Sequence, residues 1–224
     1  MELTRTETIA GMLREYETFA TLIDSLDDTA WRSPTRCDGW EVRHVAGHII
    51  GLAEDIVAGV PGSRSPQEEA DSIGDDPPAL GAKRLMTAVE QLGPLAQAID
   101  DDNVWNGPSG VPDLTMAEGI LAIWYDTYVH GEDVRAAVGR GTGDRTSLRA
   151  AVVDLQGNLT KRGWGPATIA FTDTDVELDD LVISGADASS PRHEVAAADF
   201  VLAATGRLDP TTIGLDPSVN IYAA

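Results

Sequence analysis

The sequence predicts a mainly α protein in which a four-helix bundle over residues 1–141 precedes a small α/β domain over residues 142–224. Apolar residues recur at helical spacing in four long stretches before residue 140. Beyond that point, short alternating runs rich in β-branched residues appear, and these are typical of half-buried strands. A chain of 224 residues, 42% of them hydrophobic, is long enough to bury one core or two small ones.

Breaks rich in Gly, Pro and polar residues separate the first three helices. The first helix is expected between Leu3 and Leu26, and the second begins near Trp40, after the break "DDTAWRSPTRCDGW". The polar connection "GVPGSRSPQEEADSIGDDPP" comes next. A connection of this length is either functional or disordered, and the sequence leaves both readings open. The third helix is expected from about Ala79 to Ile99.

The fourth helix has clear signals at both ends. Thr115 and Glu118 form a capping box, in which each side chain satisfies a backbone N–H of the first turn. The helical spacing continues to about Val138, and Gly139 is typical of a helix C-terminus. Four long helices within 140 residues favour a bundle.

The C-terminal third has a mixed pattern. The segment "DRTSLRAAVVDLQGNL" predicts a fifth helix, and "ATIAFT" and "VELDDLVISG" predict short strands. The segment "HEVAAADFVLAATGR" returns to helical spacing and ends at Gly206. We therefore expect a small α/β unit here.

The formal net charge of −21 excludes partners that carry a strongly negative surface. A nucleic-acid backbone or an anionic membrane would repel such a chain. The sequence has no apolar run near the ~20 residues that a membrane helix needs, and no secretory signal at its start. We therefore expect a cytoplasmic protein with no nucleic-acid or membrane partner.

Cys37 is the single cysteine, which excludes an intrachain disulfide and a metal site built on several thiolates. Apart from Arg36, no base or cationic cluster lies near it in the sequence, so we expect a buried, unreactive thiol.

A candidate metal site combines the second and fourth helices. Asp126 and His130 are four residues apart and therefore share one helix face, and His48 supplies a third ligand if the two faces meet. Two imidazoles and one carboxylate leave a coordination position open, as in catalytic zinc sites. The alternative is an ordinary i,i+4 hydrogen bond and a packed histidine. His44, on the same face as His48, is a fourth ligand, a partner of a ligand or a partly exposed residue.

Several segments resemble the mycothiol-dependent maleylpyruvate isomerase family of the DinB-like metal-binding superfamily. "WRSPTRCDGWEVRHVAGHI", which begins at Trp31, and "DTYVHGEDVRAAVG", which begins at Asp126, are similar to its two signatures. "FTDTD" from Phe171 and "AATGR" ending at Arg207 are similar to its C-terminal segments. The resemblance covers most of the chain in the expected order.

The resemblance implies a DinB-like four-helix bundle with a divalent metal, usually zinc, bound by His48, Asp126 and His130. It also implies mycothiol as cofactor and a catalytic role for Arg207, whose guanidinium can hold a substrate carboxylate by two hydrogen bonds. A cation that offsets the helix dipole is the other reading of Arg207. The characterised isomerase has Glu at the position of Asp126 and no histidine at that of His44.

The expected activity is that of an isomerase or S-transferase acting on a small electrophilic substrate. A free thiol has a pKa near ~8.5, and a metal with an open position converts it to the thiolate that attacks the electrophilic carbon. Addition to an activated cis double bond permits rotation before elimination, whereas a transferase releases the adduct. Asp133 is either a partner that orients His130 or half of a surface ion pair. A metal-dependent hydrolase and a non-catalytic ligand-binding or regulatory protein are the alternatives.

Overall fold

The computed structural model describes residues 2–173 and 178–223. Most of the regular structure is helical, which confirms the predicted mainly α class. The chain divides into two compact units, Thr4–Gly143 and Asp144–Ala224, the latter together with residues 1–3.

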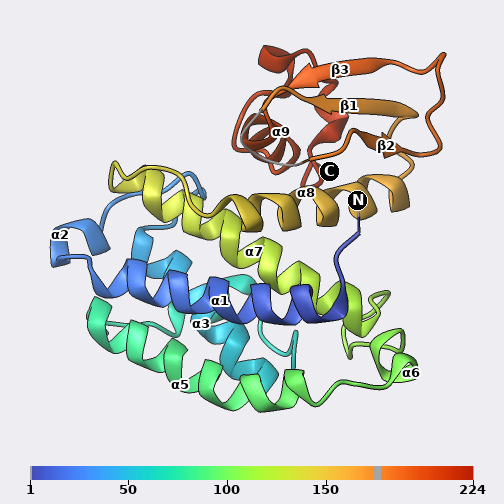
Figure 1. The fold of residues 1–224 in the computed structure, drawn as a ribbon. Coiled ribbons are helices and arrows are strands. Elements are labelled where there is room, and N and C mark those ends of the chain that lie inside the picture. Colours follow the sequence, from blue (N-terminus) through green and yellow to red (C-terminus); the bar gives the residue numbers. More distant parts are fainter. Residues whose placement is uncertain (1, 174–177, 224) are drawn as a thin grey trace. The chain divides into compact units, whose positions relative to one another are not determined.

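The first unit is a bundle of four long helices (Figure 1). Helix α1 packs against α5 and α7, and α3 packs against the same two helices. Their shared interior contains fully buried side chains such as Phe19, Ile49, Leu85 and Trp124. The four predicted helices are confirmed, and their bounds are α1 Arg5–Asp24, α3 Val42–Val57, α5 Pro78–Gln97 and α7 Met116–Ala137.

Capping residues set the ends of the helix that carries two candidate ligands. The Thr115 side chain accepts from the backbone N–H of Glu118, and the Glu118 side chain accepts from that of Thr115, so the predicted capping box is present. Gly139 follows the helix with a φ of 68°, in the left-handed region that glycine adopts without strain. The start and end of α7 are therefore encoded locally.

The connections between the bundle helices contain short helices. Residues 59–77 are ordered around α4, so the disordered reading of this segment is wrong. Arg64 attaches the start of this connecting segment to α3. Its guanidinium forms a bidentate ion pair with Asp55 at 2.7 and 3.0 Å and donates a hydrogen bond to the carbonyl of Gly51. Arg84 of α5 holds its end through Asp76 and the carbonyl of Ser72. These short helices are α2 Asp28–Trp31, α4 Pro66–Asp71 and α6 Asp102–Trp105.

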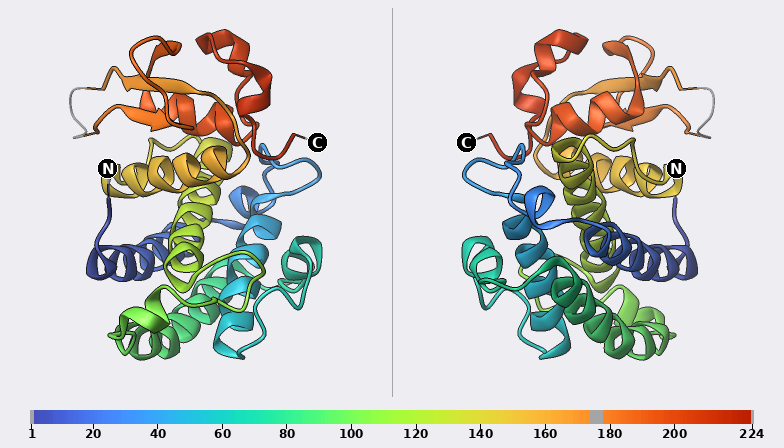
Figure 2. Two further views of the ribbon diagram at one scale, coloured as in Figure 1. Left: turned by 90° about the vertical axis from the view of Figure 1, so that its right-hand side faces the viewer. Right: turned by 90° about the vertical axis from the view of Figure 1, so that its left-hand side faces the viewer.

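The second unit is the small α/β structure that the sequence predicts. Its strands form one sheet in the order β2-β1-β3, with β1 antiparallel to β2 and parallel to β3. Helices α8 and α9 contact each other, and Figures 1 and 2 show them on one side of the sheet. The elements are α8 Arg145–Lys161, β1 Ala167–Phe171, β2 Leu181–Ile183, β3 Arg192–Val195, α9 Ala197–Ala204 and the 3-10 turns Pro210–Ile213 and Pro217–Val219.

Two details of this unit differ from the sequence-based expectation. His193, Glu194 and Val195, assigned to the start of a helix, belong to β3, because they pair with β1 and the helix begins only at Ala197. The strand expected in "VELDDLVISG" is present, but it covers only Leu181–Ile183. The first two residues of the quoted segment, 176 and 177, lie outside the described part of the chain. Among the described residues, none of the helices is long and apolar enough to span a bilayer.

Candidate metal centre

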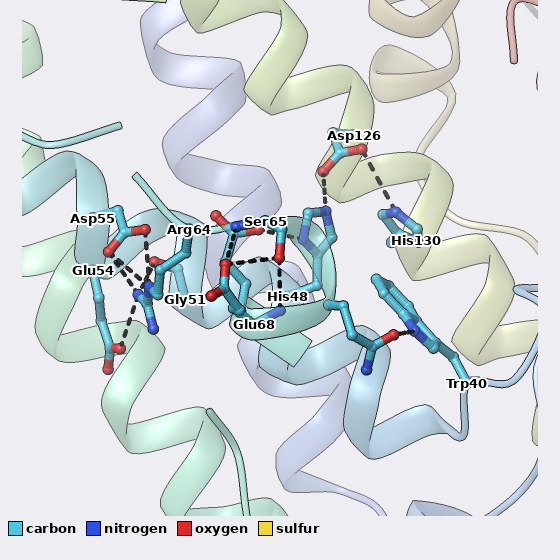
Figure 3. Close-up of polar contacts among 12 residues, drawn as sticks. Trp40, His48, Gly51, Glu54, Asp55, Arg64, Ser65, Glu68, Asp126 and His130 are labelled. Carbon is cyan, nitrogen blue, oxygen red and sulfur yellow. Dashed lines mark hydrogen bonds and ion pairs between the residues drawn. The ribbon is translucent and has the colours of Figure 1, made fainter. Parts of the chain in front are cut away.

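The two helix faces meet as predicted, and they bring His48, Asp126 and His130 together (Figure 3). His48 Nε2 lies 3.2 Å from Asp126 Oδ2, and His130 Nε2 lies 3.6 Å from Asp126 Oδ1. The two imidazole side chains are 11% exposed and the Asp126 side chain 23%. The Asp126 carboxylate therefore lies between two largely buried rings and is the most accessible of the three groups.

The other nitrogen of each imidazole faces a second carboxylate. His130 Nδ1 lies 3.2 Å from Asp133 Oδ2, and His48 Nδ1 lies 2.7 Å from Glu69 Oε2. Asp133 has a fully buried side chain and an ion pair with Arg36 at 3.1 Å, so the surface ion-pair reading of Asp133 is wrong. Glu69, which comes from α4, was not among the residues singled out in the sequence.

The carboxylates control the protonation of His48 in the protein without a metal. Burial disfavours the imidazolium, but the hydrogen bonds and negative charges of Asp126 and Glu69 outweigh it and raise the pKa of His48 to about 10. A metal that binds Nε2 must displace the proton at that atom.

Tyr16 of α1 contributes a buried hydroxyl close to the same carboxylates. Burial, and then the negative charges of Asp126 and Glu69, raise the pKa of Tyr16 well above its usual range, so the phenol stays protonated. The side chain of Thr127 is a hydrogen-bonding neighbour of this hydroxyl, and the Thr127 hydroxyl itself donates to the carbonyl of Ile123.

The donor set fits a divalent metal. His48, Asp126 and His130 each offer one ligand atom, and these three atoms lie within 4.8 Å of one another. Tetrahedral ligands at 2.0–2.2 Å from zinc are about 3.4 Å apart, which is within this limit. Imidazole nitrogens with carboxylates behind them are also the usual environment of metal-binding histidines.

Trp40 borders the two imidazoles. Its ring centroid is 5.6 Å from that of His48 and 6.3 Å from that of His130, and its Nε1 donates to Gln67 of α4 at 3.0 Å. Three aromatic residues of α7 are buried in the bundle: Trp124, Tyr125 and Tyr128.

His44 and Cys37 have contacts that their sequence neighbourhood did not indicate. His44 Nδ1 accepts from the backbone N–H of Glu41 and so caps the start of α3. The Cys37 thiol is only half-buried, donates to Asp133 Oδ2 at 3.2 Å and lies 3.8 Å from His130 Nδ1. The expectation of a buried thiol is therefore wrong, and an imidazole and a carboxylate of α7, both distant in the sequence, lie beside it.

Arg207 belongs to the C-terminal unit, where it follows α9 and Gly206. Its backbone N–H donates to the carbonyl of Leu202 at 2.7 Å, and its guanidinium donates to that of Thr205 at 3.1 Å. Both acceptors lie at the C-terminus of the helix, where a cation is favourable.

Comparison with known families agrees with this geometry. Residues 12–135 match the model of the mycothiol maleylpyruvate isomerase N-terminal domain, which is more than half of the chain. The chain belongs to this family. The match includes both faces of the candidate metal centre, since it covers α3 and ends within α7.

Two solved structures are similar over nearly the whole length. The crystal structure of the mycothiol-dependent maleylpyruvate isomerase has a TM-score of 0.68 at 14% identity, with 96% of each chain covered. A histidine-to-alanine mutant of that isomerase has a TM-score of 0.66 at the same identity and coverage. At this identity the likeness establishes the fold. None of the curated proteins matches the chain.

Proposed function

We propose that this protein is a metal-dependent, mycothiol-dependent isomerase or S-transferase that acts on a small electrophilic substrate. The observation that carries the proposal is the convergence of the Nε2 atoms of His48 and His130 on Asp126, with a carboxylate at each Nδ1. Membership of an isomerase family supports an enzyme with a thiol cofactor.

His48, Asp126 and His130 would hold the metal, with zinc the ion best suited to this mixed donor set. When bound, the ion would lower the pKa of the cofactor thiol and keep it as the reactive thiolate.

The surrounding residues keep the donor set in place. Asp133 holds the His130 ring from behind, and Arg36 compensates its buried negative charge. The burial of both imidazoles limits the access of water, and Asp126 is the most accessible of the three ligands. A role of Arg207, which belongs to the other unit, in binding a substrate carboxylate stays a prediction from the resemblance.

Metal analysis and a thiol-dependent assay test the proposal together. We expect one divalent ion per wild-type chain, and less than one in His48→Ala, Asp126→Ala and His130→Ala. His44→Ala is the matched control, because it removes a capping imidazole from the same helix and should keep the ion.

The assay follows the isomerisation of maleylpyruvate with and without mycothiol. A metal-loaded protein that neither binds mycothiol nor consumes it with any electrophile would contradict the proposal. Ester or amide hydrolysis without added thiol would identify a hydrolase on the same bundle.

A further inference from the structure

Glu69 makes a short, buried contact with a candidate metal ligand. Its Oε2 lies 2.7 Å from His48 Nδ1, and its side chain is 3% exposed. A buried carboxylate is costly unless it is paired, so this contact is a specific feature of the fold. His48 thereby lies between Glu69 at one nitrogen and Asp126 at the other.

Packing of α4 against α3 fixes the position of Glu69 independently of that contact. Gly47 and Gly51 have no side chains and so let α4 approach the backbone of α3 closely. A Cβ on Gly47 would lie 2.3 Å from the Ala70 carbonyl oxygen, and a Cβ on Gly51 would lie 2.9 Å from the Glu69 Cβ. Ser65 begins α4 with a capping box. The residues around the contact, rather than the ion pair itself, therefore place the carboxylate behind the imidazole.

The arrangement repeats on the other helix, where Asp133 lies behind His130. A carboxylate that accepts from Nδ1–H fixes the tautomer with its lone pair on Nε2, and it also fixes the rotation of the ring. On α7 this carboxylate comes from the same helix as the ligand, three residues further on. On α3 it comes from the connecting segment, 21 residues further on.

We propose that Glu69 is a positioning residue, which α4 places behind His48 so that Nε2 of this ring faces the metal. The proposal depends on the proposed function in one respect, namely that His48 is a metal ligand. Glu69 itself does not touch the metal, because its carboxylate is on the far side of the ring from Asp126.

Zinc affinity of the full chain is the first measurement, by competition with a chromogenic chelator at constant pH. Loss of a carboxylate behind a metal-binding histidine typically weakens the metal about 10- to 100-fold, and we expect this for Glu69→Ala. Glu69→Gln keeps the shape and an acceptor oxygen, so it should lose less. Asp71→Asn, an exposed residue of the same helix, is the matched control and should bind zinc like the wild type.

The mobility of the His48 ring is the second measurement, and a purely structural role of Glu69 would leave it unchanged. The chain has four histidines, so each ring can be assigned in long-range ¹H–¹⁵N spectra of the zinc-loaded protein with the histidine variants. Zinc at Nε2 leaves the proton of His48 on Nδ1 in every variant, so ring mobility is the readout. We expect sharp His48 signals in the wild type and in Glu69→Gln, and signals broadened by motion of the ring in Glu69→Ala.

The outcomes separate this inference from the proposed function. If the wild type binds zinc and both Glu69 variants keep its affinity and its His48 signals, the positioning role is wrong while the metal site stands. If affinity falls but the His48 signals stay the same, Glu69 acts only on stability, and the inference is overturned. A folded wild type that binds no zinc would overturn the metal site and this inference together.

Discussion

The His48 imidazole lies between two carboxylates, and its protonation governs the site before a metal binds. In the metal-free protein these groups raise its pKa from 6.5 to about 10, so the folded chain holds the proton more tightly than the unfolded chain does. The resulting stabilisation is fully present below pH 6.5 and is lost as the pH rises towards 10.

We therefore expect the free energy of unfolding of the chelator-treated protein to fall between about pH 7 and pH 10. Urea titrations across this range measure it. His48→Gln removes the titrating ring and should give a shallower decline. An equally steep decline in this variant would show that other groups cause the pH dependence.

At the residue scale, the site residues that could be predicted were those with helical spacing or a rare residue type. Asp126 and His130 share a helix face because they are four residues apart, and histidine is rare enough in this chain to make His48 conspicuous. Glu69 has neither property, because it is one of 37 acidic residues and lies in a Gly- and Pro-rich connection. Cys37 was misjudged for a similar reason, since its neighbours His130 and Asp133 come from a distant part of the chain.

At the scale of the elements, α4 is attached to the bundle by close backbone packing. Gly47 and Gly51 leave room for it, and a methyl group at Gly47 would overlap the carbonyl oxygen of Ala70. Overpacking of this kind typically costs about 1–3 kcal/mol. The position of Glu69 should shift with the helix.

We expect Gly47→Ala to lower the free energy of unfolding by this amount and to weaken zinc binding at the same time. Gly93→Ala in α5 is the control, because its Cβ would meet nothing within 4 Å. Replacing such a helical glycine typically stabilises by about 0.5–1 kcal/mol. Denaturant unfolding and chelator competition give both quantities, and normal zinc affinity in Gly47→Ala would mean that α4 does not control the site.

Periodicity and caps account for which elements were predictable. The long bundle helices have apolar faces over several turns, and α7 also has both end signals, so their existence was clear from the sequence. Helix α4 has six residues and is too short for a periodic pattern, although Ser65, Pro66 and Glu68 are a helix-start signal. Most of strand β3 was read as helix because its pairing with β1 is a long-range property, and a strand of four residues is too short to show a period of its own.

At the scale of the whole molecule, the net charge of −21 attracts cationic ligands and repels anionic ones. The enzyme proposed here takes an electrophile that bears a carboxylate, and the overall field of the protein repels such an anion as it approaches. Added salt screens this repulsion, because the Debye length falls from ~30 Å at 0.01 M to ~8 Å at 0.15 M ionic strength. The few cations close to the proposed site, such as Arg36, act over a much shorter range.

We therefore expect kcat/KM for a dianionic substrate to rise severalfold between about 10 and 150 mM salt. An uncharged ester of the same substrate is the control and should show little dependence. Steady-state kinetics at fixed mycothiol concentration and pH measure both. A fall of kcat/KM with salt for the dianion alone would show that the local positive field of the bound metal outweighs the charge of the whole chain at the point where the substrate binds.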